Sequence, residues 1–385
     1  DTGIGMNEAD LVEQLGTIAR SGTRSFIEQM TGDNKQDSNL IGQFGVGFYS
    51  SFMTAEKVEV ITRKAGEDEA FKWTSDGKGE YEIESSERDT AGTTVILYLT
   101  EDGKEFANRW RIESIIKKYS NHIPFPIYLH FEETTYEGEG DDKKEKKEQK
   151  TEQINAASAM WKQPKRELTD EDYKEFYRTI AHDTGDPLMW VHTQAEGTLE
   201  YTTLFYVPEQ APFDMYYADY QPGVKLYVKR VFITDDEREL LPTYLRFVRG
   251  VTDSEDLPLN VSREILQQNR VLAKIKSSSV TKLLEEFKEL SKKDSEKYQK
   301  FIEQYNRPLK EGLYQDFANK DILLELVRFK STKAEKFTSL EEYKGRMQPD
   351  QNAIYYITGE KEENLRNSPL LEMYRKKDIE VLIMD

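Results

Sequence analysis

The sequence predicts an α/β protein with two successive domains, the first built on an antiparallel sheet and the second on a sheet combined with helices in layers. Three observations support this prediction. Strand-like segments with period-two or continuous β-branched character recur in both halves of the chain. Helical segments with apolar residues spaced three or four apart lie between them. A stretch at 132–152 with almost no apolar residue separates the two halves.

Composition limits the class of protein. A chain of 385 residues is long enough for two or three domains with cores of their own. It has no cysteine, which excludes disulfides and thiol chemistry and fits a reducing cytoplasm. Its net charge of -18 argues against nucleic acid as a partner, and the lack of long apolar runs argues against a membrane. The four histidines show no metal-ligand spacing, so we predict no metal ligand in this chain.

The chain opens with the glycine turn Asp-Thr-Gly-Ile-Gly-Met at 1–6. Asn7 is placed to cap a helix whose apolar residues Leu11, Leu15 and Ile18 share one face. An ionised carboxylate at the start of this turn can accept a hydrogen bond from the exocyclic amine of an adenine, while the glycines let the base approach the backbone. The alternative is an ordinary surface turn. Because the first residue already belongs to a motif, we expect the chain to be part of a longer protein.

Three glycines at 42, 45 and 47 lead directly into the apolar segment 48–53. Glycine adopts positive φ at no steric cost, so this spacing allows backbone N–H groups to face a ligand. A helix that begins near Gly47 would add the positive end of its dipole, and together these groups would bind a phosphate. The alternative is a tight turn that allows close helix packing.

The rest of the first domain is predicted as an antiparallel sheet followed by a helix. Strands are expected at 57–63, 79–84 and 94–100, and a helix at 110–119. Thr93 stands at a strand entrance, where its hydroxyl either faces a ligand or serves only as a β-former. The stretch 132–152 is too charged to bury surface, so we expect a mobile linker there.

In the second domain, strands and helices alternate. Thr169 is placed to cap the first helix. A long helical tract near 280–305 is expected to end at Pro308. The predicted strands are 187–191, 201–207, 224–234, 353–358 and 379–384, and the predicted helices are 170–181, 239–249 and 262–274.

Arg263 lies in the first turn of a predicted helix, where a cation is unfavourable against the helix dipole. One explanation is an anion supplied from outside: a guanidinium that cannot lose its proton can reach a terminal phosphate, as an arginine finger does. The other is an ion pair with a neighbouring carboxylate such as Glu255. Gln267, one turn further on, shares the face of Arg263 and is placed to orient it.

Four motifs, at 1–6, 15–23, 41–50 and 253–269, resemble those of the ninety-kilodalton heat-shock chaperones, with the bacterial branch as the nearest group. The resemblance covers nearly the whole chain and is weakest in the charged stretch. It implies a two-layer α/β sandwich nucleotide domain of the GHKL or Bergerat type, incomplete at its N-terminus, followed by an α/β/α middle domain. The implied domains are 1–131 with a lid, a linker at 132–153, and 154–385 divided into 154–293 and 294–385.

The resemblance also assigns residues to ATP binding. Asp1 would hold the adenine amine, with Thr93 assisting through water, and Gly5 and Met6 would line the base pocket. Residues 17–47 would form a mobile lid, and Arg20 stands where the family commonly has a lysine near the phosphates. The phosphates would be carried by Gly42, Gln43, Gly45, Val46, Gly47 and Phe48, and Arg263 with Gln267 would reach the γ-phosphate.

The resemblance implies an ATP-dependent molecular chaperone in which binding and hydrolysis of ATP drive closure of the lid and domains around unfolded or partly folded client proteins. The general base Glu and the Mg²⁺-binding Asn of the family lie upstream of residue 1, and the C-terminal domain that forms the homodimer is absent. We therefore expect weak or absent hydrolysis by this chain. Gln14 departs from the asparagine of many eukaryotic members, which puts its role as a ligand in doubt. Phe213 and Trp161 match exposed contact sites for the nucleotide domain and for clients, although either could be a core residue.

Two other interpretations of the function remain. A topoisomerase subunit, a mismatch-repair ATPase or a sensor kinase shares the glycine-loop nucleotide fold. The acidic charge and the isolated histidines argue against these enzymes. A non-hydrolysing fragment that only binds clients is the remaining alternative.

Overall fold

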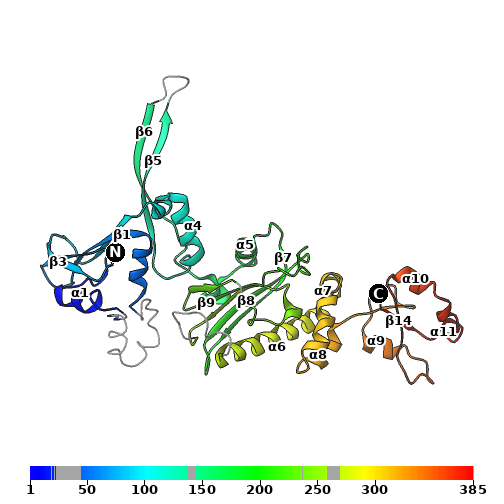
Figure 1. Ribbon diagram of the computed structural model, residues 1–385. Helices are drawn as coiled ribbons and strands as arrows, with labels where there is room; N and C mark the ends of the chain where they lie inside the picture. The colour runs from blue at the N-terminus through cyan, green and yellow to red at the C-terminus, as the bar shows by residue number, and fades with distance from the viewer. Residues whose placement is uncertain are drawn as a thin grey trace. The chain divides into compact units, whose positions relative to one another are not determined.

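The computed structural model describes residues 1–18, 20, 22, 45–137, 144–235, 237–257 and 269–384. The chain forms two compact units. Unit 1 consists of Asp1–Asn121 and Pro126–Ala156, and unit 2 consists of His122–Phe125 and Ala157–Asp385. Figure 1 shows the elements of both units. Of the predicted site residues, Gly42, Gln43, Arg263 and Gln267 lie outside the described residues, as does most of the predicted lid.

Unit 1 is built on a four-stranded antiparallel sheet in the order β3-β2-β1-β4. The prediction of an antiparallel sheet is confirmed, although β2 was not predicted. Alternate residues of β1, among them Val58 and Val60, are buried against Leu11 and Trp73 and form a small core. The strands are β1 (Ala55–Arg63), β2 (Ala70–Ser75), β3 (Tyr81–Ser86) and β4 (Gly92–Leu99).

Helix α1 (Glu8–Gln14) begins at the predicted cap. The Asn7 side chain accepts from the backbone of Asp10, whose carboxylate accepts from the backbone of Asn7 in return. Leu11 is fully buried, as expected. The helix ends at Gln14, and Ile18 is 73% exposed, so its assignment to the buried helix face is wrong.

Three further helical segments of unit 1 lie within the described residues. The segment after the glycine loop is a 3₁₀ helix, η1 (Gly47–Met53), that begins at the predicted residue. A second 3₁₀ helix, η2 (Asp102–Ala107), precedes α4 (Arg109–Tyr119). Asn108 caps α4, which confirms the helix predicted at 110–119.

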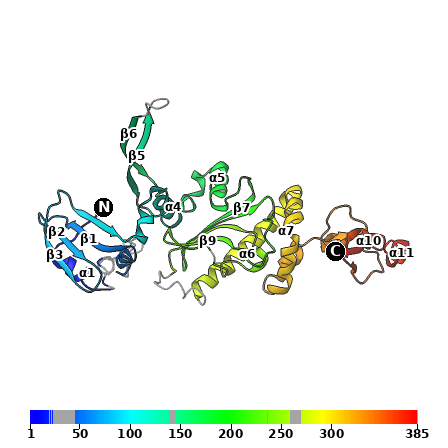
Figure 2. The same cartoon turned by 45° about the horizontal axis from the view of Figure 1, so that its top comes forward.

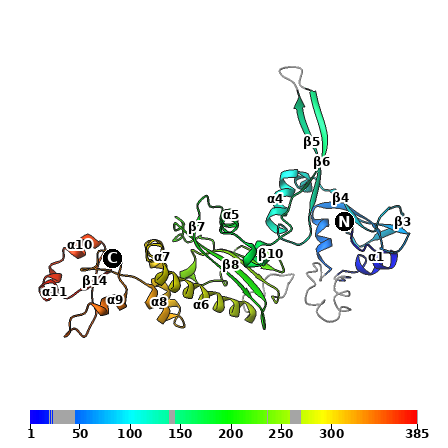
Figure 3. The same cartoon turned by 180° about the vertical axis from the view of Figure 1, so that it is seen from behind.

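The charged stretch forms an antiparallel pair, β5 (Tyr128–Glu137) and β6 (Lys144–Gln153), so the expectation of a linker without ordered structure is wrong for these residues. Figures 1 and 3 show this hairpin as a ribbon that extends beyond α4. Charge pairing across the strands replaces apolar burial, since Lys147 lies 2.9 Å from Glu132. At its base, Arg109 of α4 lies 3.6 Å from the ring centre of Phe131 and pairs with Glu152 at 2.7 Å.

Unit 2 contains a five-stranded mixed sheet in the order β10-β9-β11-β8-β7. Strands β9 and β11 are parallel, and the other neighbours are antiparallel. Three predicted strands are confirmed, except that the segment 224–234 divides at a turn into β9 and β10. The strands are β7 (Pro187–Ala195), β8 (Tyr201–Pro208), β9 (Gly223–Val228), β10 (Val231–Thr234) and β11 (Arg249–Ser254).

The helix predicted at 239–249 is wrong. Only a 3₁₀ turn, η6 (Thr243–Leu245), forms after Pro242, and the chain then enters β11, the central strand. Phe247 and Val248 are nonetheless buried, so the apolar spacing reflected burial in the core rather than a helix.

Helices lie on both faces of this sheet. Helix α5 (Asp170–Ala181), capped by Thr169 as predicted, packs on one face with the 3₁₀ segment η4 (Met160–Lys162), which η5 (Lys165–Glu167) follows. The other face carries α6 (Arg270–Lys293), α7 (Ser295–Gln315) and α8 (Lys320–Leu326). Figures 2 and 3 show α5 and α6 on opposite sides of the strands.

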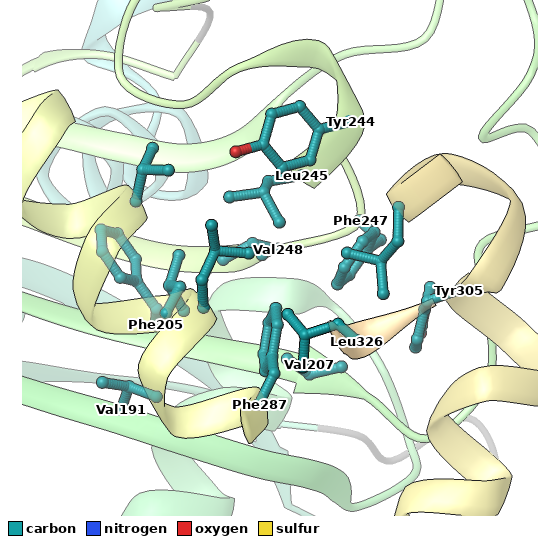
Figure 4. Packing of buried hydrophobic residues seen from close by; sticks show 14 of the residues in the cluster. Val191, Phe205, Val207, Tyr244, Leu245, Phe247, Val248, Phe287, Tyr305 and Leu326 are labelled. Atoms are coloured by element: carbon teal, nitrogen blue, oxygen red, sulfur yellow. The ribbon is translucent and has the colours of Figure 1, made fainter. Parts of the chain in front are cut away.

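Pro308 does not break the helical tract, because α7 continues through it to Gln315. Its neighbours Tyr305 and Leu309 are fully buried in the main core, and this packing offsets the backbone hydrogen bond that a proline removes. Figure 4 shows the stacking in that core, where the Phe247 and Tyr305 ring centres lie 4.1 Å apart.

The end of the chain forms a small α/β part with a three-stranded sheet in the order β12-β14-β13, which confirms the two predicted terminal strands around a helical segment. Within the described residues, no helix is both long and apolar enough to cross a membrane. The elements are β12 (Lys330–Ser331), α9 (Leu340–Gly345), β13 (Tyr355–Thr358), α10 (Glu362–Arg366), η8 (Pro369–Leu371), α11 (Glu372–Lys376) and β14 (Val381–Met384).

Candidate functional site

The first residue of the chain is hydrogen-bonded to the start of β4. The Asp1 backbone nitrogen donates to the Thr93 carbonyl at 2.8 Å, and Oδ1 of Asp1 accepts from the backbone N–H of Thr93 at 3.1 Å and of Gly3 at 2.9 Å. Arg88 donates to the Asp1 carbonyl at 2.8 Å. Within the described part of the chain, no donor reaches Oδ2 of this exposed carboxylate. The structure thus brings Asp1 and Thr93 together and leaves one carboxylate oxygen able to accept an amine.

A buried hydroxyl, that of Thr62, joins the opening motif to β4. Thr62 is fully buried, and its Oγ1 accepts from the Met6 backbone at 2.9 Å. It donates to the Gly92 carbonyl at 3.1 Å and lies 3.0 Å from the Thr93 hydroxyl. Because the single Thr62 proton is directed to Gly92, the Thr93 hydroxyl is the donor in that pair. Thr62 was not among the predicted site residues. Its position in line with the inward-facing residues of a strand could have indicated that its side chain is buried.

Gly5 allows the motif to cross closely over the end of β1. Its φ is +68°, and a Cβ added there would lie 1.8 Å from the Arg63 carbonyl oxygen. The neighbouring Ile4 carbonyl accepts from the Ala65 backbone at 2.7 Å. Only glycine tolerates both the positive φ and the close approach to the Arg63 carbonyl. This fits the predicted place of Gly5 in the base pocket.

The described part of the glycine loop leads into η1. Gly45 has φ of +62°, and a Cβ there would lie 1.8 Å from the Arg20 carbonyl oxygen. The Arg20 guanidinium is exposed and pairs with Glu13 at 2.9 Å. Val46 precedes the first turn of η1, where its carbonyl accepts from Tyr49 at 3.2 Å. A Cβ at Gly47 would meet no atom within 4 Å, so no contact within the described chain requires a glycine there.

One small core supports both motifs. Phe48, the first residue after the glycines, packs edge-on against Trp73 with ring centres 5.6 Å apart. Met6, at the end of the opening motif, packs against the same cluster. The predicted base pocket and the phosphate loop therefore rest on shared apolar residues: Leu11, Ala55, Val58, Val60 and Trp73.

The described residues of the opening motif suit the adenine of ATP. A carboxylate oxygen open to an amine, beside a glycine at close backbone approach, suits an adenine. Among the described residues, no group of three histidine or carboxylate side chains lies close enough to hold a metal ion.

Two further predicted contact residues lie in unit 2. Phe213 is 89% exposed, as expected for a surface contact. Trp161 is fully buried, so its interpretation as a surface residue is wrong and the core alternative holds. Its indole Nε1 donates to Oδ2 of Asp253 at 2.8 Å, and its ring packs beside Tyr227.

Two family models match the chain. Residues 1–94 match the model described as "Histidine kinase-, DNA gyrase B-, and HSP90-like ATPase". Residues 132–385, well over half of the chain, match the model described as "Hsp90 protein". The chain belongs to the Hsp90 family. The ATPase-type match of unit 1 contains Asp1, Gly5, Thr62 and Thr93, and the Hsp90 match contains nearly all of unit 2.

Curated Hsp90 relatives agree with this placement. The chain is 62% identical over 400 residues to the chaperone protein HtpG of Treponema denticola. It is 61% identical to that of Aliarcobacter butzleri and 59% identical to that of Helicobacter pylori. In each case the match covers 100% of this chain and 62% of the relative. The chain therefore spans less than two thirds of the length of these Hsp90 relatives.

Proposed function

We propose that this chain is the nucleotide-binding and middle part of an ATP-dependent molecular chaperone that uses ATP hydrolysis to close around client proteins and fold or remodel them. The observation that carries the proposal is the Asp1 carboxylate, tied through Oδ1 to Thr93 with Oδ2 open to a donor, inside a segment that matches the Hsp90-like ATPases. The relatives named as chaperones support the cellular role.

The finer assignments belong to the same proposal. Unit 1 supplies most of a Bergerat-type two-layer sandwich, and unit 2 corresponds to the α/β/α middle domain, with domain boundaries at 131 and 154. Asp1, Gly5, Met6 and Thr93 bind the adenine, and residues 42–48 with Arg20 bind the phosphates. Arg263, with Gln267, stabilises the charge on the γ-phosphate. Mg²⁺, a homodimer and a cytoplasmic location are further parts of the proposal.

Each part of the site has a distinct task. The Asp1 carboxylate fixes the base by accepting its amine, while the Thr62 hydroxyl holds Met6 and Thr93 in position beside it. Bound ATP supplies the phosphoanhydride bond that is cleaved. A guanidinium near the γ-phosphate lowers the barrier by stabilising charge as it develops, which requires Arg263 to approach from unit 2.

The first test is steady-state ATP turnover. We compare this chain with an extended chain, in which the residues that precede the corresponding motif in the Treponema denticola relative are fused to Asp1. If the general base lies upstream, only the extended chain turns over ATP. Efficient hydrolysis by the chain alone would place the base within residues 1–385 and contradict the proposed mechanism.

The arginine is tested in the extended chain by Arg263→Ala. Turnover should fall by about 10²-fold or more while the nucleotide Kd stays unchanged, because the guanidinium acts on the transition state. Arg270→Ala removes an exposed arginine at the start of α6 and serves as the matched control. Equal turnover in the two variants would remove Arg263 from the mechanism.

A further inference from the structure

The contact between α6 and the five-stranded sheet of unit 2 is mainly apolar. Helix α6 contributes Leu272, Ile275 and Val280 to the main core, together with further apolar residues near its end. Ser279 interrupts this face, because it is only 4% exposed and yet carries a hydroxyl. Burial of a hydroxyl costs free energy unless the group is hydrogen-bonded, so Ser279 should have a partner.

Within the described part of the chain, the Ser279 hydroxyl has no hydrogen-bond partner. Its Oγ is buried and neither donates to nor accepts from a protein group there. A serine in a helix can donate to a carbonyl of the preceding turn, as Ser291 of the same helix does to Lys288 at 2.7 Å. Ser279 does not form such a bond, so its hydroxyl is available to a partner from outside the chain.

The sheet presents further hydroxyls to the same contact. Thr203 of β8 is in register with Thr193 of β7 and with Thr252 of β11, and residues in register share one face of a sheet. Phe205, two positions from Thr203, belongs to the main core, so this is the face that α6 covers. Thr203 and Thr252 are 2% and 1% exposed, and the Thr252 hydroxyl also has no partner among the described residues. Buried hydroxyls therefore lie on both sides of the contact.

A cavity of about 10 Å³ lies between the helix and this row of threonines. Its polar lining includes Ser279 of α6 and Thr193 and Thr203 of the sheet, while Val191 and Phe205 supply apolar walls. A volume of about 10–15 Å³ on this measure is enough for one water molecule. The cavity is therefore large enough for a single water and too small for a larger ligand.

The lining of the cavity suits water better than an ion. Among the described residues that line it there is no carboxylate to hold a cation. Its one charged side chain, Lys282, pairs with Glu286 at 2.8 Å, which leaves little attraction for an anion. A hydroxyl can donate and accept, and a buried water typically makes about three hydrogen bonds to groups that otherwise lack partners. Ser279, Thr193 and Thr203 supply three such groups.

We propose that this cavity is a binding site for one ordered water molecule, which joins the Ser279 hydroxyl of α6 to the Thr193 and Thr203 hydroxyls of the sheet. The water gives the helix a polar contact at one place along an apolar interface. Hydrogen bonds have a defined geometry, so this contact specifies one alignment of α6 on the sheet, which apolar packing alone specifies less strictly. The site lies within unit 2 and does not depend on the proposed ATPase function.

A crystal structure of this chain, at a resolution that shows ordered waters, tests the site directly. A peak of electron density is expected in the cavity, about 2.7–3.2 Å from Oγ of Ser279 and from a hydroxyl of Thr193 or Thr203. A cavity without density, with the Ser279 hydroxyl donating to the Ile275 carbonyl instead, would overturn the proposal.

Substitutions show whether the hydroxyls hold the water. Thr203→Ser keeps a hydroxyl and should keep the density. The double variant Thr203→Val with Ser279→Ala removes two of the three polar partners and should lose it, because an apolar cavity stays dry. Density that persists unchanged in the double variant would mean that these hydroxyls do not form the site.

Stability provides a second test whose sign separates the two cases. If Ser279 is bonded to a water, Ser279→Ala leaves that water short of a partner, and the equilibrium constant of unfolding should rise about fivefold or more. If the hydroxyl is unpaired, its removal should leave stability unchanged or increase it. Urea unfolding measures the constant.

Ser277→Ala is the matched control for this test. Ser277 lies on the same helix but is exposed and does not line the cavity, so both variants share the change in helix propensity. Unfolding of Ser277→Ala should stay within about twofold of the unsubstituted chain. A Ser279→Ala variant as stable as Ser277→Ala, or more stable, would contradict a bound water at Ser279.

Discussion

Thr62 shows how much of the candidate site depends on one side chain. Its hydroxyl joins Met6, Gly92 and Thr93, which belong to two separate parts of the sequence. We predict that Thr62→Val lowers the free energy of unfolding by about 1–3 kcal/mol, because buried polar groups lose their partner. It should also weaken nucleotide binding by the extended chain. Chemical denaturation and equilibrium titration measure the two effects.

Thr74→Val is the control for this prediction. Thr74 lies on the neighbouring strand β2 in register with Glu59, and no hydrogen bond of the site depends on it. If the two valine variants have the same stability and the same affinity, Thr62 does not organise the site.

Two glycines with positive φ provide a second residue-level prediction. Gly5→Ala should reduce the free energy of unfolding by about 1–3 kcal/mol more than Gly66→Ala, because the added methyl group would lie 1.8 Å from the Arg63 oxygen. Gly66 has φ of +83° but open space around it, so its alanine variant reports the backbone strain alone. Urea unfolding of both variants makes the comparison. Equal losses would mean that the motif does not cross β1 this closely.

At this scale the sequence indicated which residues of the opening motif and of β4 lie together better than it indicated the residues that hold them. Asp1 and Thr93 were predicted and lie together. Thr62 and Arg88 were not, because the partners that define these supporting side chains in the site lie 30 to 87 positions away, and no local pattern records those partners.

Among the elements, the β5–β6 hairpin departs most from expectation. Strand prediction depends on apolar alternation, whereas this ribbon is stabilised by opposite charges across the strands and by an arginine on α4. Likewise, the spacing of the buried residues at 239–249 matched a helical period, although only a 3₁₀ turn forms there. At Pro308, core packing keeps α7 continuous. In each case tertiary contacts overrode a local preference.

Hydrogen exchange tests the hairpin. Amides of residues 128–134 and 146–153 should exchange more slowly than those of an unstructured segment, because they are paired between strands. Arg109→Ala removes the contacts to Phe131 and Glu152 and should raise exchange at the base of the ribbon. Arg111→Ala, on the same helix, is the control. Uniformly fast exchange in the unsubstituted chain would restore the linker interpretation.

At the scale of the whole molecule, pH reports on the aromatic cluster of unit 2. Nε2 of His192 must donate to the Trp161 carbonyl, and in the neutral ring Nδ1 accepts from the Tyr173 hydroxyl. Burial lowers the pKa of His192 below its ordinary value, and the same cause lowers the pKa of His122. Below about pH 6.5 the unfolded chain therefore binds more protons than the folded one, and stability falls as pH drops.

We predict that the free energy of unfolding falls between pH 7.5 and pH 5.5, with His192 contributing up to about 1.4 kcal/mol. His192→Gln should remove that part of the pH dependence. Denaturant unfolding at the two pH values provides the measurement, and His182→Gln, at the end of α5, is the control. An unchanged pH slope in His192→Gln would show that this ring does not stay neutral on folding.

The sequence predicted the family and the two-part α/β organisation because its motifs are local and specific. It could not predict which side chains from distant parts of the sequence pack together. The packing of His122 against Trp161 joins residues on either side of the whole hairpin, and burial of Trp161 follows from that packing rather than from its neighbours in sequence.

The chain passes between the two units more than once, and this affects how the molecule can be divided into fragments. The chain leaves unit 1 after Asn121, returns to it at Pro126, and leaves it again after Ala156. A single proteolytic cut after Ala156 would therefore separate His122 from the rest of unit 2. A recombinant unit 2 that starts at Ala157 lacks the His122 ring that packs against Trp161. A fragment that starts at His122 keeps this contact and includes the β5–β6 hairpin.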